Sequence, residues 1–171
     1  IGLTRYALGE LAIAGETLAK ALNQYMHLGD AEGLAVSLSN LGLVHLANGD
    51  LAKAEQCFVR AIDIQQQRGD HLAVARQQGH LGLILRAQGN LAEAEQIHHQ
   101  ALQVVAAAGD LSSEATQRLN LASLAYLHGR FPEAEQEYRA ALALYEAVDD
   151  RQGQADILAN LGNIAHAQSR W

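Results

Sequence analysis

The chain has 171 residues, of which 49% are hydrophobic, so it can form one domain or a short repeat array with a buried core. Only 5% of the residues are aromatic and one is proline, a composition that favours packed helices over a sheet. The net charge of −7, without a basic stretch, argues against nucleic acid and anionic membranes as partners. No apolar run reaches the ~20 residues of a membrane span.

Residues of the same type recur every 40 positions along the chain, which indicates a repeat protein. Each unit contains two segments with apolar residues at steps of three and four, the pattern of a helix with one buried face. Glycine suits the left-handed position that ends a helix, and a following aspartate can cap the next helix. These residues recur at Gly9, Gly49, Gly89 and Gly129, and as Gly-Asp pairs at 29–30, 69–70 and 109–110.

The pattern predicts nine helices, each of about 18 residues and roughly 27 Å long. In chain order, a partial and a full helix occupy 1–28, pairs occupy 31–68, 71–108 and 111–148, and an unpaired helix starts at 151. The domain organisation is then a single array over 1–171, made of a partial repeat 1–30, repeats 31–70, 71–110 and 111–150, and the unpaired helix 151–171. Because the chain begins inside a repeat and lacks an initiator Met, we expect it to be a fragment or a processed product.

These repeated residues resemble the signature of the tetratricopeptide repeat (TPR) family, over essentially the full length of the chain. The second unit supplies Leu38, Leu41, Gly42, His45, Ala54, Phe58 and Ala61, and the fourth supplies Leu121, Ala122, Ala134, Tyr138 and Ala141. Histidines replace the usual aromatic residues at 45 and 98, and the period is 40 rather than about 34. The longer period is similar to that of kinesin light chain, the Leu-Gly-Asn polarity proteins and the sensor arms of bacterial transcription activators.

The resemblance implies an all-α fold, a right-handed α-solenoid of TPR-type helix-turn-helix repeats. It also implies a non-catalytic protein–protein interaction scaffold, in which the first helix of each pair lines a concave groove that binds a peptide. No cofactor is implied. The candidate peptide-binding residues on these first helices are Asn40, Leu43, Arg76, His80, Leu83, Arg86, Asn120, Tyr126, Asn160, Asn163 and His166.

One column of the repeat is polar, with Asn40, His80, Asn120 and Asn160 in equivalent positions. An asparagine amide donates and accepts hydrogen bonds together, so a ladder of them can hold an extended peptide backbone. Two alternatives remain open: the amides bond to the neighbouring repeat and stiffen the stack, or duplication copied them without a role.

Other groove residues also have two interpretations. Arg76, Arg86 and Tyr126 can anchor acidic or aromatic side chains of a partner, or they are ordinary solvated residues. Leu43 and Leu83 either form an exposed apolar patch or pack against an adjacent helix.

No catalytic or metal-binding motif is present in the sequence. No two histidines have the i, i+4 spacing of a helical metal pair, and we expect His98 to fill the core and His99 to be on the surface. Cys57 is predicted to be a buried apolar residue rather than a nucleophile. Because it is the only cysteine, no intrachain disulfide can form, which fits a cytoplasmic location.

Three functions are compatible with this reading. The first is a scaffold for a protein or peptide partner, and the second is an effector-sensing regulatory arm of a larger signalling or transcription protein. The third is self-association, because the helix that starts at 151 has no second helix to cover Leu158 and Leu161, which leaves them to bury against another copy.

Overall fold

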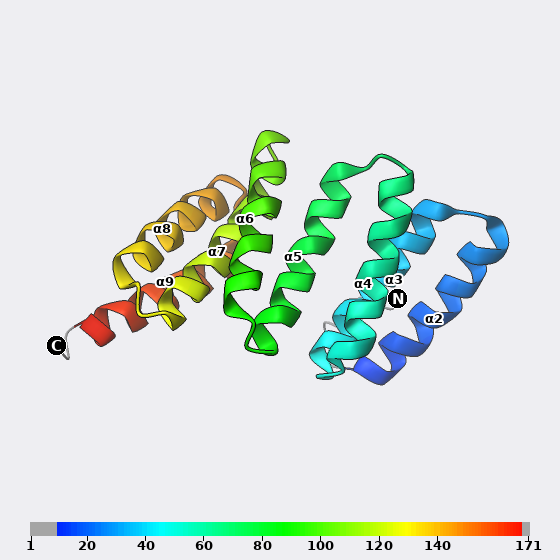
Figure 1. Ribbon diagram of the computed structural model, residues 1–171, viewed down its shortest axis with the longest axis horizontal. Coiled ribbons are helices and arrows are strands. Elements are labelled where there is room, and N and C mark those ends of the chain that lie inside the picture. The colour runs from blue at the N-terminus through cyan, green and yellow to red at the C-terminus, as the bar shows by residue number, and fades with distance from the viewer. Residues whose placement is uncertain (1–9, 169–171) are drawn as a thin grey trace. The chain divides into compact units, whose positions relative to one another are not determined.

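The structure, a computed structural model, describes residues 10–168. Over that range the chain forms eight α-helices and no strand (Figure 1). The fold is an all-α helical-repeat solenoid, as the sequence predicts, and the partial helix predicted before residue 10 lies outside the described residues. The helices are α2 (Leu11–Leu28), α3 (Ala31–Ala47), α4 (Leu51–Gln67), α5 (His71–Ala87), α6 (Leu91–Ala107), α7 (Leu111–Leu127), α8 (Phe131–Ala147) and α9 (Arg151–Gln168).

Two compact units make up the chain, residues 1–84 and 85–171, and their boundary falls within α5. In the first unit, α3 packs against both α2 and α4. In the second unit, α7 packs against α6 and α8, and α8 packs against α9. Consecutive helices within each unit lie side by side and antiparallel (Figure 1). The description of residues 1–171 as one array with the repeat boundaries given above stays a prediction.

Turns of two residues between α2 and α3, and of three residues between the later helices, connect the chain. The turn from α3 to α4 shows how they work. Gly49 adopts a φ of 77°, and its N–H donates to the Leu46 carbonyl while the Asp50 N–H donates to the His45 carbonyl. These two bonds close the end of α3 in the left-handed glycine motif that terminates helices. The Asp50 carboxylate then accepts from the Lys53 N–H, which caps α4. The predicted roles of glycine and aspartate are confirmed here.

The same turn chemistry recurs with three exceptions. Asp30, Asp70, Asp110 and Asp150 each accept a backbone N–H three residues ahead. Asn90 and Arg130, which precede α6 and α8, make no side-chain capping bond. The third exception is Asp149, which occupies the glycine position with a φ of 53°. Aspartate tolerates this left-handed conformation better than most residues, so the turn keeps its geometry at a small cost in strain.

Small residues bring the helices close enough for large ones to interlock. Ala54, Ala94 and Ala134 are fully buried at equivalent positions of the second helices. In the first unit Phe58 inserts against α3, where a Cβ added at Gly42 would lie 2.6 Å from its ring. Glycine is therefore required at position 42, because any side chain would displace a buried aromatic ring.

Cys57 differs from its predicted environment, whereas Leu158 is uncovered, as the sequence predicts. Cys57 is half-buried rather than buried, and partial burial raises the pKa of its thiol. Leu158 on α9 is 57% exposed, and no heavy atom lies within 4 Å of a Cβ built at Gly162 on the same helix. No described residue therefore covers this face of α9.

The same substitution should have opposite effects at two glycines. Gly49→Ala is expected to lower the free energy of unfolding by about 1–2 kcal/mol, because alanine is strained at positive φ. Gly162→Ala is expected to raise it by about 0.5–1 kcal/mol, because this glycine is helical and has open space around it. Urea denaturation followed by circular dichroism measures both. Equal effects in the same direction would contradict the turn analysis.

Candidate functional site

The predicted groove residues of the first unit lie on α3 and α5. Asn40 is half-buried on α3, and Arg76 is exposed on α5. The His80 ring stacks on Phe58 with centroids 4.9 Å apart and an interplanar angle of 26°. Leu43 packs against the core cluster of Ala54, Phe58 and Ile84, which favours packing over an exposed patch. Leu83 is half-buried on α5. His80 and Leu43 therefore both have packing contacts within the first unit.

The remaining candidates belong to the second unit and differ in accessibility. Asn120 is only 9% exposed, whereas Asn160 is half-buried and Asn163 and His166 are exposed. Tyr126 is half-buried and its ring lies 5.5 Å from that of Phe131, tilted by 60°. Arg86 is half-buried near the end of α5. Asn40 and Asn160 are therefore the members of the asparagine column that a partner can reach most readily.

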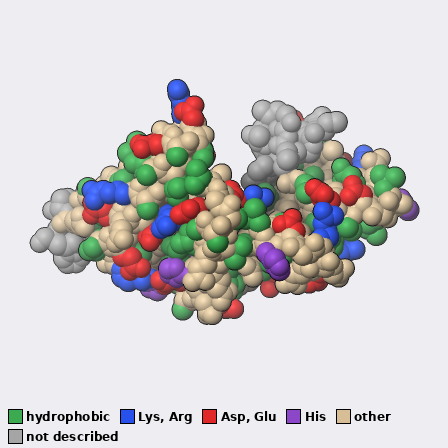
Figure 2. Space-filling model, turned by 90° about the horizontal axis from the view of Figure 1, so that it is seen from above, with side chains coloured by type: hydrophobic (Ala, Val, Ile, Leu, Met, Phe, Trp, Pro, Cys, Tyr) green, Lys and Arg blue, Asp and Glu red, His purple; other side chains and the backbone are tan. Residues whose placement is uncertain are grey.

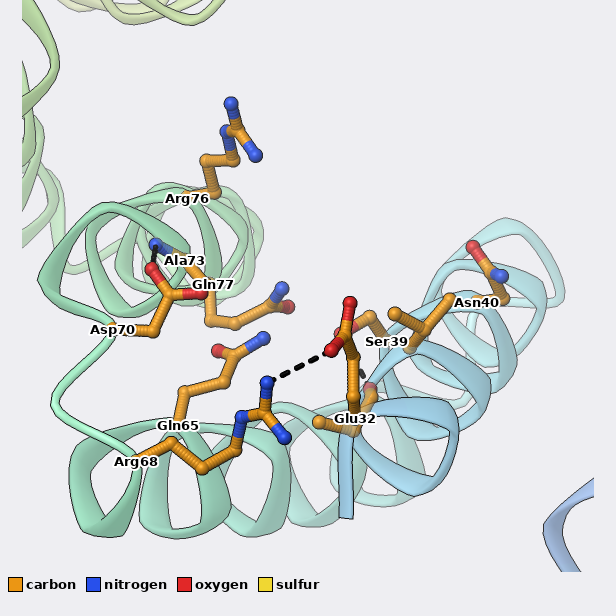
Figure 3. A pocket seen from close by; sticks show the side chains of 11 residues that line it. Glu32, Ser39, Asn40, Gln65, Arg68, Asp70, Ala73, Arg76 and Gln77 are labelled. Atoms are coloured by element: carbon orange, nitrogen blue, oxygen red, sulfur yellow. Dashed lines mark hydrogen bonds and ion pairs between the residues drawn. The ribbon is translucent and has the colours of Figure 1, made fainter. Parts of the chain in front are cut away.

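A cavity of about 240 Å³ opens in the first unit, where α3, the end of α4 and the start of α5 meet (Figure 3). The space is much larger than the roughly 10–15 Å³ that one water molecule requires. The predicted groove residues Asn40 and Arg76 both line it. The full lining is Glu32, Ala35, Val36, Ser39, Asn40, Gln65, Arg68, Asp70, Ala73, Arg76 and Gln77.

Two glutamines of this cavity are almost fully buried. Gln65 on α4 is 7% exposed and Gln77 on α5 is 6% exposed. The Oε1 atom of each side chain has no hydrogen-bond partner among residues 10–168. A buried amide oxygen without a partner costs roughly 1–3 kcal/mol, so these groups favour the binding of a hydrogen-bond donor.

The sequence analysis missed these glutamines, although the 40-residue alignment contains the signal. At equivalent places elsewhere the chain has Tyr25 facing Gly33 and Tyr145 facing Gly153. A Cβ at Gly153 would lie 2.7 Å from the Tyr145 ring, so the ring fills the space against bare backbone. Gln65 and Ala73 replace this tyrosine–glycine pair where repeat 31–70 meets repeat 71–110. The loss of the ring leaves the cavity, and the alanine methyl group prevents its simple return.

The charges of the cavity cancel. An ion pair joins Arg68 to Glu32 at 2.9 Å, and Asp70 accepts the Ala73 N–H at 2.9 Å (Figure 3). With Arg76, two basic and two acidic groups line the space. On the molecular face in Figure 2, Lys and Arg side chains lie among acidic ones and form no basic patch. The cavity is thus polar without being a strong attractor for either charge.

A second buried polar group lies in the other unit. His98 is fully buried, and its Nδ1 donates to the Gln117 Oε1 at 2.8 Å. Its Nε2 is then an acceptor that no described residue serves. Burial lowers the pKa of His98. The predictions of a core His98 and a surface His99 are confirmed.

Over residues 10–168, no three His, Cys, Asp or Glu side chains gather where they could hold a metal ion. No helix in that part of the chain is both long and apolar enough to cross a membrane.

Comparison with known proteins agrees with the repeat architecture. The tetratricopeptide repeat profile matches residues 1–67 and 71–147. The chain belongs to the tetratricopeptide repeat family. Repeats of this family form protein-interaction scaffolds, so the TPR chain has the fold of a scaffold. A search of curated protein sequences finds no match.

Several solved structures share the fold at low sequence identity. BtubC (BKLC) from P. vanneervenii is similar with a TM-score of 0.70 and 20% identity, over 99% of this TPR chain and 79% of that chain. RapI in its apo form has a TM-score of 0.76 and 15% identity over 99% of this chain and 47% of RapI. The TPR-like repeats of a putative kinesin light chain from Podosopora anserina have a TM-score of 0.66 and 18% identity. The match covers 99% of this chain and 94% of that chain. At these identities the likeness shows the fold alone.

The His98–Gln117 pair predicts how stability depends on pH. Because the pKa of His98 is lower in the folded chain, the unfolded chain binds the proton first as the pH falls below the ordinary histidine value of 6.5. The free energy of unfolding should therefore decline from pH 6.5 downward. The decline is about 1.4 kcal/mol for each unit of pKa depression.

The variant His98→Leu/Gln117→Ile tests this origin of the pH dependence. It carries residues that the chain itself uses at the equivalent positions, Leu18 and Ile157. Urea denaturation between pH 5 and pH 7 should show a flatter profile for the variant. An unchanged slope would place the pH dependence in other groups.

Proposed function

We propose that this TPR chain is a non-catalytic scaffold that binds an extended peptide segment of a partner protein on its first helices. The observation that carries the proposal is the column of amide side chains, of which Asn40 on α3 and Asn160 on α9 are half-buried and open to a partner. Side chains of this kind hold peptide groups by donating and accepting hydrogen bonds together. The family's general use as a protein-interaction scaffold supports the same reading.

The proposal also covers partners and location. The net charge of −7 and the mixed charges of the face in Figure 2 favour a protein partner over nucleic acid. A single, half-buried cysteine with a raised pKa suits a reducing cytoplasm and gives no activated nucleophile.

Peptides selected from a phage-displayed random library provide the test. The chain is expected to enrich peptides that bind in solution, as measured by fluorescence polarisation. Asn40→Ala or Asn160→Ala, whichever lies in the unit that holds the peptide, should weaken binding about fivefold to tenfold. That loss corresponds to one peptide hydrogen bond, roughly 1 kcal/mol.

A matched control separates this effect from a general loss of asparagines. The control variant Asn23→Ala/Asn90→Ala removes two exposed asparagines that are not on first helices. It should bind with unchanged affinity, and circular dichroism should show equal helicity for all variants. Enrichment of no peptide, or equal weakening by the control, would contradict the proposed groove.

Self-association is the second candidate, because no described residue covers Leu158 and Gly162 on α9. In α3 the equivalent glycine, Gly42, receives the Phe58 ring. We expect sedimentation equilibrium to show a concentration-dependent mass that Leu158→Glu converts to a monomer, since a buried charge opposes association. A monomer at all concentrations would rule this candidate out. The third alternative, an effector-sensing arm, stays a hypothesis.

A further inference from the structure

We infer that the cavity between α3, α4 and α5 is a subsite for a carboxamide side chain, asparagine or glutamine, of the bound peptide. The inference rests on the proposed peptide-binding function and names the chemistry that one part of it recognises. Its basis is the pair of glutamines, Gln65 and Gln77, that line the cavity with unpartnered amide oxygens.

The two glutamines provide a built polar surface rather than a chance gap. Both side chains are more than nine-tenths buried, and they reach the cavity from different helices (Figure 3). The terminal bond of a glutamine turns readily between two orientations, so each amide can present either its oxygen or its NH₂ group to an occupant. A third amide complements both orientations, because it also donates and accepts. Its NH₂ group carries two protons and can serve two acceptor oxygens together.

Other occupants fit the cavity less well. An apolar side chain would leave both amide oxygens buried without partners, so the free-energy cost of burying them would not be relieved. A carboxylate would have to give up its hydration beside Arg68, whose charge Glu32 already neutralises at 2.9 Å. An ammonium or guanidinium group would have to give up its hydration beside acidic groups that are already engaged, Glu32 by Arg68 and Asp70 by the Ala73 N–H. A neutral amide avoids all three penalties.

The position of the cavity places such a side chain beside the proposed peptide path. Asn40, a member of the amide column, lines the same space as Gln65 and Gln77 (Figure 3). A peptide backbone held at Asn40 can therefore direct one side chain into the cavity. Unlike the column, the subsite selects for sequence.

The chain itself suggests the variant that closes the subsite. Gln65→Tyr/Ala73→Gly installs the pair found at Tyr25/Gly33 and Tyr145/Gly153, where the ring packs on glycine backbone. This variant should remain fully helical, with a thermal midpoint no lower than that of the parent, because it fills a cavity with a combination that the fold already uses. A second variant, Gln77→Met, keeps the volume and removes one amide.

The probes are acetylated, amidated pentapeptides of glycine and serine with glutamine, asparagine, glutamate or leucine at the centre. Nitrogen–proton NMR spectra of the parent should show saturable shifts of the Gln65 and Gln77 side-chain amides on addition of the glutamine or asparagine peptide. Binding should be about fivefold to tenfold tighter than that of the leucine peptide, the gain from one to two net hydrogen bonds. The preference should disappear in Gln65→Tyr/Ala73→Gly and weaken in Gln77→Met.

Three results would overturn the inference. One is binding of the leucine or glutamate peptide with the same affinity as the glutamine peptide. Another is a preference for the glutamine peptide that persists in Gln65→Tyr/Ala73→Gly. In the third, shifts at Asn40 occur without any at Gln65 or Gln77, which rejects the subsite but leaves the proposed peptide scaffold intact. Failure of the proposed function would look different, because no peptide would then shift Asn40 or Asn160 either.

Discussion

The fold depends on one local constraint, the short turn in which a left-handed residue, glycine at every described turn but one, ends a helix, and at most turns a following aspartate caps the next helix. The glycine satisfies the last carbonyls of one helix, and the aspartate satisfies the first N–H groups of the next. A turn this short leaves consecutive helices antiparallel and in contact. Alanines at fixed offsets then let the helix axes approach, and large residues such as Phe58 interlock with glycine or alanine on the facing helix.

Much of this architecture could be predicted because it is periodic. A turn residue that recurs four times reports a backbone requirement, and so Gly49 could be assigned its role from the sequence. Asp50 does not recur at its own register, and its capping role followed from its residue type directly after the glycine. The buried positions of Ala54 and Phe58 followed from helical spacing in the same way. The half-buried state of Cys57 did not, since its position lies at the edge of the apolar face, where periodicity is a poor guide to exposure.

The candidate site was less predictable, because it arises where the repeat departs from its own pattern. A comparison of four repeats emphasises what they share, whereas the cavity exists because Gln65 and Ala73 differ from the tyrosine and glycine at equivalent positions. Nor does a one-dimensional pattern show that His80 stacks on Phe58 or that Asn120 is nearly buried. In both cases the neighbouring helix decides how much of the side chain a partner can reach.

The central claim, that the first helices hold a peptide, is tested most directly by locating a bound peptide. Isotope-filtered NMR of the chain with a library-selected peptide would detect nuclear Overhauser effects between the two molecules. The account predicts contacts from peptide backbone protons to the side-chain amide of Asn40 or of Asn160. Contacts confined to the second helices α2, α4, α6 and α8 would contradict it and would place the binding surface on the opposite set of helices.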